Sequence, residues 1–313
     1  MTAWGAGQHL DRGVVLDFGT ARARVSSLGI ASFGSALARV YGEFEPIDDD
    51  GICEVSVLLR PVTGNWLKKP EIELVSDGAR LFDAFAPTLH LPLFEWGVNF
   101  LLAQRLLHLL LLHAGSVALD DRAIVMPALP GSGKSTLTAA LACRGFRLLS
   151  DEFGLVNLNS GMLHPLVRPI CLKNESIEVI RRLWPSAVLG PEFAGTRKGT
   201  VAHVAPNAQS VSCRYRPAKP VAIVFPRYRR GASLVVERVT RASAFNSLAV
   251  NSFNYTFLGP LGFRCVARLV EQCPVYRLSY DRLDEAVACL QEIVADRRPS
   301  GLLESPVELL HNA

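Results

Sequence analysis

Several features that would place this chain of 313 residues in a specialised class are missing from it. Its seven cysteines form no C-x-x-C pair, which argues against a zinc site and favours free thiols in a reducing cytoplasm. The chain has no long Lys/Arg tract and a formal net charge of only +4, so nucleic acid is not an implied partner. The short basic stretch Arg227–Arg230 is interpreted as a solvated turn.

Long apolar runs are also missing. The most apolar stretch, Phe100–Leu112, covers about 13 residues and is interrupted by polar side chains, so it is too short and too polar to cross a bilayer. The first residues lack the basic start and apolar segment of a secretory signal. We therefore expect a cytoplasmic protein with no transmembrane segment.

The most informative feature present is the glycine-rich segment ALPGSGKST at residues 128–136. It follows the apolar run Ala123–Pro127, precedes a helix predicted over 136–143, and fits a nucleotide-binding P-loop with Ala128 in place of the usual first glycine. Glycines in such a loop turn backbone N–H groups toward phosphate oxygens, and the helix N-terminus favours the anion. A Gly/Ser turn between a strand and a helix is the alternative. The residues expected to bind the nucleotide are Pro130, Gly131, Ser132, Gly133, Lys134, Ser135 and Thr136.

Four side chains in and after this loop have distinct expected roles. Lys134 would reach the β- and γ-phosphates, and Ser135 would bind the Mg²⁺ that bridges them. The run Leu148–Glu152 predicts a strand that ends in two acids, Asp151 and Glu152, beside the phosphates. Such acids can hold Mg²⁺ or act as a base, and a surface acid pair at a strand end is the alternative. The predicted cofactors are ATP and Mg²⁺.

The pattern of apolar runs predicts the organisation of the chain. Strands are expected over 13–18 and 72–75, a buried strand over 108–119, and strands alternate with helices from there, which is typical of an α/β fold with a mixed sheet. The stretch Pro87–Pro92 is the expected domain boundary. We expect a smaller N-terminal α+β accessory domain over residues 1–90 and an α/β kinase-type domain over residues 91–313.

His113 ends an apolar run before the predicted P-loop strand, where a lone histidine is usually structural. Here it precedes Lys134 by 21 positions, and Asp151 follows Lys134 by 17. The stretch Arg144–Glu152 reads RGFRLLSDE. Over residues 108–153 the chain thus resembles the HPr kinase/phosphorylase family, and more closely its bacterial HprK-related kinases.

This resemblance implies a P-loop kinase domain whose fold is akin to that of phosphoenolpyruvate carboxykinase. It also implies that this kinase domain phosphorylates a serine hydroxyl. By resemblance, Asp151 is the catalytic base and His113 orients the acceptor hydroxyl, with Lys134 on the phosphates. Ser135 and Glu152 coordinate Mg²⁺, for which Asp151 is a further candidate. Glu152 stands where the family has Asp, and the family's later signature, an acid followed by I-R-G-L-G-I, is absent. The nearest candidate for it is Leu166–Leu172, in which Arg168 matches the arginine and Val167 stands in place of the acid.

The basic loop Gly195–Thr200 contains Arg197 and Lys198, which would bind the γ-phosphate or an anionic acceptor, or else form a solvated turn. The expected activity is ATP-dependent phosphoryl transfer to a hydroxyl, a serine of a protein or peptide. The sequence does not identify the acceptor, and it does not distinguish a homo-oligomer from a monomer. The competing interpretations are a small-metabolite kinase, a P-loop NTPase that uses Asp151 and Glu152 as a Walker B pair, and a non-catalytic nucleotide sensor.

Overall fold

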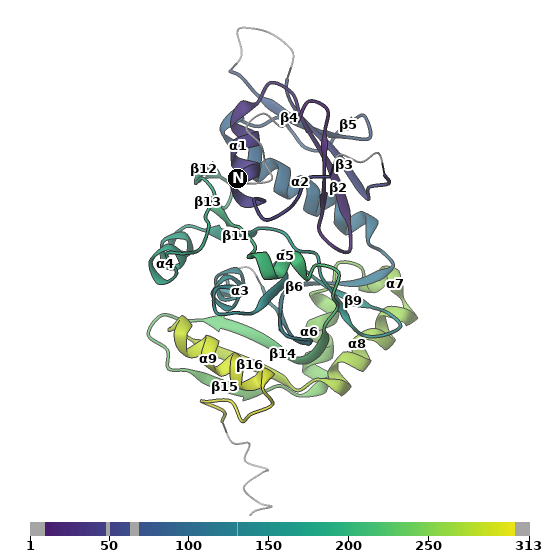
Figure 1. Ribbon diagram of the computed structural model, residues 1–313. Helices are drawn as coiled ribbons and strands as arrows, with labels where there is room; N and C mark the ends of the chain where they lie inside the picture. The colour runs from purple at the N-terminus through teal and green to yellow at the C-terminus, as the bar shows by residue number, and fades with distance from the viewer. Residues whose placement is uncertain (1–9, 48–50, 63–68, 130, 304–313) are drawn as a thin grey trace, which may run out of the picture. The chain divides into compact units, whose positions relative to one another are not determined.

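The chain forms two compact units in a computed structural model that describes residues 10–47, 51–62, 69–129 and 131–303 (Figure 1). Both units combine helices with sheets that contain parallel or antiparallel strand pairs, so the chain belongs to the α/β class. The first unit contains Met1–Leu106 and Leu166–Tyr215, and the second contains Leu107–Pro165 and Arg216–Ala313.

The first unit contains a mixed sheet in the order β1-β2-β3-β4-β5, in which β2 and β3 are parallel. Its strands are β1 (Val14–Asp17), β2 (Arg22–Ser27), β3 (Val55–Pro61), β4 (Ile72–Ser76) and β5 (Ala79–Arg80). A smaller antiparallel sheet has the order β11-β13-β12. It is formed by β11 (Ile170–Lys173), β12 (Phe193–Thr196) and β13 (Gly199–Val204).

Helix α2 (His90–Arg105) explains why the first unit extends past the boundary expected at 87–92. It packs against β3, β4 and α1, and the side chains of Leu91, Phe94 and Val98 are buried. Because burial of these apolar groups is favourable, the helix belongs with the first sheet and the unit continues through Leu106. The remaining helices of this unit are α1 (Ala31–Val40), the short η1 (Pro87–Leu89), α4 (Glu175–Leu183) and α5 (Ala208–Ser212).

Residues 166–215 return to the first unit, which differs from the single domain expected over 91–313. Leu166 forms a β-bridge with Gly19, and the Val167 N–H donates to the Phe18 carbonyl at 2.9 Å. Gly19 has a φ of 102°, and a Cβ on it would lie 2.0 Å from the carbonyl oxygen of Arg214. This close backbone approach requires glycine and joins the two chain segments.

The second unit is built on a mixed sheet in the order β10-β9-β6-β7-β14-β16-β15, with β8 also paired to β6. Strands β7, β14 and β16 are parallel to one another, whereas β6 is antiparallel to β7, β8 and β9. The strands are β6 (Leu109–Leu119), β7 (Arg122–Pro127), β8 (Arg147–Ser150), β9 (Phe153–Asn157), β10 (Leu163–His164), β14 (Lys219–Tyr228), β15 (Val235–Arg238) and β16 (Val275–Tyr280).

Helices pack against this sheet as two groups. Helix α3 contacts α9 and β6, and α9 contacts β14 and β16. Helices α6 and α8 contact each other (Figure 1). They share a buried apolar cluster with side chains of β6, β7 and β14. The helices of the second unit are α3 (Lys134–Cys143), α6 (Arg241–Val250), α7 (Tyr255–Leu258), α8 (Pro260–Gln272) and α9 (Leu283–Val294).

Candidate functional site

The glycine-rich loop, residues 128–133, connects the carboxyl end of β7 to the first residue of α3. Gly131 and Gly133 have φ angles of 85° and 86°, in the left-handed region that glycine adopts without strain. The Ser132 N–H donates to the Leu129 carbonyl at 3.3 Å. Pro130, which the sequence assigned to the nucleotide site, lies outside the described residues.

The loop fits a phosphate-bearing group in two respects. The Oγ of Ser132 is buried and has no hydrogen-bond partner within the described part of the chain. Helix α3 begins directly after the loop, so the N–H groups of its first turn, which includes Ser135 and Thr136, have no acceptor within the helix. Unpaired donors at a helix N-terminus, next to a glycine-rich turn, suit an anion.

Lys134 and Asp151 form a buried pair beside this loop. The Nζ of Lys134 donates to the main-chain oxygen of Asp151 and lies 3.4 Å from its Oδ1. Only 8% of Lys134 and 7% of Asp151 are exposed. A buried ion pair of this kind is costly to desolvate, and the electrostatic attraction between the two groups offsets part of that cost.

The two acids follow β8, as the sequence predicts, and they interrupt the pairing of this segment with β6. Before them, Ser150 pairs with Ser116 of β6. After them, the pairing starts again at Phe153, which pairs with His113 of the same strand. The Ser150 Oγ accepts a hydrogen bond from the Phe153 N–H at 3.1 Å and closes this interruption. The strand predicted over Leu148–Glu152 therefore ends at Ser150, a second strand begins at Phe153, and the interruption places both acids beside β6.

His113 lies in the middle of β6 and contacts Glu152. Its Nε2 is 3.7 Å from the Glu152 Oε1, and the side chains are 27% and 40% exposed. The His113 ring also packs against Phe253, with 5.6 Å between the centroids, and its backbone N–H donates to the Asn251 carbonyl at 2.6 Å. His113 is therefore at the surface of the site rather than in the core, and the carboxylate against it is that of Glu152, the neighbour of Asp151.

Gly115 is a site residue that was not singled out from the sequence. A Cβ at this position would lie 2.4 Å from the Thr138 Oγ1 of α3. That hydroxyl donates to the Lys134 carbonyl at 2.9 Å. The glycine thus permits the first turns of α3 to pack closely on β6, which brings Lys134 to Asp151. A glycine inside a predicted strand is a recognisable sign of such close approach.

Two tyrosines at the ends of β14 and β16 support the other side of the loop. The Tyr228 N–H donates to the Ser132 carbonyl at 2.9 Å. A Cβ on Gly133 would lie 2.8 Å from the Tyr280 Oη and 2.9 Å from the Tyr228 Cβ. Burial, together with the nearby Tyr228, raises the pKa of Tyr280, so its hydroxyl stays protonated. Residues 227–230, interpreted from the sequence as a solvated turn, therefore include a contact to the loop that the sequence did not reveal.

Three cationic residues singled out from the sequence lie in the first unit. Arg197 and Lys198 are exposed in the turn between β12 and β13, where the Lys198 Nζ lies 6.0 Å from the centre of the Trp96 ring. Arg168, the nearest match to the missing signature, is buried and pairs with Glu95. Arg168 therefore has a structural partner, and a nucleotide-binding role for Arg197 and Lys198 stays a prediction.

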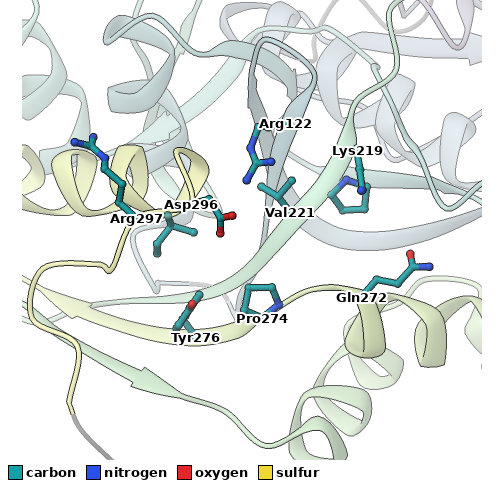
Figure 2. Close-up of a pocket in the computed structure, with 10 residues that line it drawn as sticks. Arg122, Lys219, Val221, Gln272, Pro274, Tyr276, Asp296 and Arg297 are labelled. Atoms are coloured by element: carbon teal, nitrogen blue, oxygen red, sulfur yellow. The ribbon is translucent and has the colours of Figure 1, made fainter.

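A cavity of about 220 Å³ lies at the opposite edge of the second sheet (Figure 2). Its lining includes Arg122, Lys219 and Pro274, at the amino ends of β7, β14 and β16, whereas the glycine-rich loop follows the carboxyl end of β7. The Arg122 Nε donates to the Val294 carbonyl at 2.6 Å, so this arginine caps the end of α9. Among the described residues, none of the predicted site residues lines this cavity.

Oxygen donors for Mg²⁺ are available from Ser135, Asp151 and Glu152, and a magnesium ion on a nucleotide usually needs only one or two protein ligands. Within the described ranges, no group of three His, Cys, Asp or Glu side chains is placed to hold a metal ion.

In the described residues, no helix combines the length and apolar character needed to cross a membrane. No protein-family model matches the chain, and no curated protein matches it.

Proposed function

We propose that the chain is an ATP-dependent kinase, related to HPr kinase/phosphorylase, that transfers the γ-phosphoryl group to a hydroxyl of a protein or peptide serine. The observation that carries the proposal is the grouping of a glycine-rich loop, a buried lysine and two acids around one strand. Lys134 contacts Asp151, and Glu152 contacts His113, although these residues come from separate segments of the sequence.

In this proposal, MgATP supplies the phosphoryl group. The loop N–H groups and Lys134 bind the phosphates, and Ser135 and Glu152 hold the metal ion. Asp151 accepts the proton of the acceptor hydroxyl, and His113 orients that hydroxyl. The Lys134–Asp151 pair implies a sequence of events. Bound phosphate first attracts Lys134, and the Asp151 carboxylate is then available as a base.

The first experiment measures nucleotide binding by thermal unfolding. At a concentration one hundred times its Kd, MgATP stabilises a protein by about 2.7 kcal/mol, and we expect Lys134→Met to remove this gain. Lys219→Met is the matched control, because Lys219 is exposed at the opposite edge of the sheet. Equal stabilisation of the Lys134 variant and the parent would contradict the proposed phosphate contact.

The second experiment separates a kinase from the competing activities. The parent protein is incubated with γ-labelled ATP and, in separate reactions, with the protein and small-molecule fractions of a lysate. Label transferred to a protein or peptide supports the proposal, and label on a small compound would instead indicate a metabolite kinase. Rapid acceptor-independent release of phosphate would identify an NTPase, and tight binding without turnover would identify a sensor.

A further inference from the structure

The order of strands defines which end of a bound nucleotide faces which side of the glycine-rich loop. The two acids lie beside β6, on one side of β7, and β14 lies on the other side of β7. If the γ-phosphate faces Asp151, as the proposed function requires, the nucleoside end of an extended nucleotide points toward the carboxyl ends of β14 and β16. Ligands of open α/β sheets bind at such carboxyl ends.

The residue at the end of β14 has the chemistry that a nucleobase needs. Tyr228 is 47% exposed although its backbone is bonded to Ser132 and its Cβ lies against Gly133. Its ring packs edge-on against the buried Tyr280, with 6.0 Å between the centroids, which orients the ring from one side. An aromatic ring held in this way and open to solvent is a stacking surface for a flat heterocycle.

Two arginines follow this tyrosine in a tight turn. The Arg229 N–H donates to the Tyr280 carbonyl at 2.9 Å, and the Ala232 N–H donates to the Arg229 carbonyl at 3.1 Å. Gly231 has a φ of 74°, as the third residue of such a turn often requires. Arg229 and Arg230 are exposed, and within the described residues neither side chain forms a salt bridge, so both cations are available to an anion.

We propose that Tyr228–Arg230 forms the nucleoside side of the binding site, with Tyr228 stacked on the base and Arg229 and Arg230 paired with phosphate oxygens. This inference rests on the proposed function and adds the recognition of a nucleoside triphosphate rather than of a phosphate group alone. It also replaces the interpretation of residues 227–230 as a solvated turn.

The test compares Mg²⁺-dependent binding of ATP and of inorganic tripolyphosphate, which has the phosphate charge but no base. Tyr228→Leu should weaken ATP binding about tenfold and leave tripolyphosphate binding unchanged, because only the stacked base is lost. The double variant Arg229→Gln/Arg230→Gln should weaken binding of both ligands about tenfold or more. Phe263→Leu and Arg264→Gln are the controls, since both residues are exposed on α8, and they should change neither affinity.

The possible results separate this inference from the proposed function. If the parent binds neither ligand, the proposed function fails and this inference fails with it. If the parent binds both and Tyr228→Leu weakens both equally, or neither, the base-stacking role is wrong while the loop assignment stands. Tyr228→Met replaces Tyr228→Leu if circular dichroism shows that the leucine variant is unfolded, with the same results expected.

Discussion

The two units each contain a buried cation–carboxylate pair, and the surroundings of the two pairs differ. In the first unit, Arg168 pairs with Glu95, donates to Asn99 and lies 5.5 Å from the centre of the Phe18 ring. The Tyr41 hydroxyl donates to the same Glu95 carboxylate at 2.7 Å. Burial, together with Glu95, raises the pKa of Tyr41 and keeps this hydroxyl a donor.

The pair in the second unit has no such support. Within the described residues, the hydrogen bonds of the Lys134 ammonium group all go to Asp151, and the Asp151 carboxylate forms no hydrogen bond or ion pair with any other side chain. The Arg168–Glu95 pair has several further partners, so its role is to stabilise the first unit. Lys134 has one partner residue, and it can exchange that partner for a ligand, as a binding site requires.

The largest expected effect comes from disrupting the pair of Lys134 and Asp151. Asp151→Asn keeps the size of the side chain but removes its ability to accept a proton, so phosphoryl transfer should fall by roughly 10²–10⁴-fold. The measurement is the initial rate of label transfer from γ-labelled ATP, with nucleotide affinity determined in parallel. A parallel loss of rate and MgATP affinity would assign Asp151 to the metal instead of the proton.

Asp296→Asn is the control for this substitution. Asp296 lines the cavity at the opposite edge of the same sheet and has a φ of 58°, a conformation that Asn tolerates. We expect it to leave the transfer rate unchanged. An equal fall in rate in both variants would show that the loss in Asp151→Asn is not specific to the site.

The second prediction concerns the buried pair of Arg168 and Glu95 in the first unit. Arg168→Met leaves the Glu95 carboxylate buried without its cation and should lower the free energy of unfolding by about 3–5 kcal/mol in urea. The double variant with Glu95→Leu should recover much of that loss, because an apolar pair needs no counter-charge. Arg264→Met, on the exposed surface of α8, is the control. A double variant as unstable as the single one would contradict this account.

The third prediction concerns the contact that brings Lys134 to Asp151. Gly115→Ala places a methyl group against the Thr138 Oγ1 and should destabilise the protein by about 1–3 kcal/mol. Adding Thr138→Ala removes the nearest atom and should restore part of the stability. Urea unfolding of the single and double variants measures both effects, and failure of the second substitution to help would mean that the strain lies elsewhere.

The smallest effect is the pH dependence contributed by His90, in the core of the first unit. Burial lowers the pKa of His90 below its ordinary value of 6.5, and its ring packs between Phe33 and Phe193. Below pH 6.5 the unfolded chain therefore binds a proton that the folded chain does not, so stability should fall as the pH falls from there to the folded-state pKa. Urea unfolding at several pH values should show a weaker dependence for His90→Phe; an unchanged slope would exclude His90 as its source.

Local features of the site could be predicted from the sequence, because apolar runs and turn residues act over a few positions. The strand predicted over 108–119 is confirmed as β6, and the helix after the loop is confirmed as α3, which begins slightly earlier, at Lys134. Features that depend on distant contacts could not be predicted. The interruption at Asp151 depends on how two strands share β6, and the position of Tyr228 depends on the order of strands in the sheet.

The domain boundary shows the same limit. Proline residues near 87–92 are a local sign of a break, but the burial of α2 against the first sheet decides where the unit ends. The role of Arg168 likewise depends on Glu95, which lies 73 positions earlier in the chain. Periodicity within a short window contains no information about such a partner.

The interleaving of the two units has a consequence for synthesis of the protein on the ribosome. Glu95 and Tyr41 emerge long before Arg168, and residues 107–165 of the second unit are made before the first unit is complete. The first unit is therefore incomplete while the glycine-rich loop of the second unit is synthesised. Any fragment that ends near residue 106 contains Glu95 without Arg168, and all residues of the first unit are present only after translation has passed residue 215.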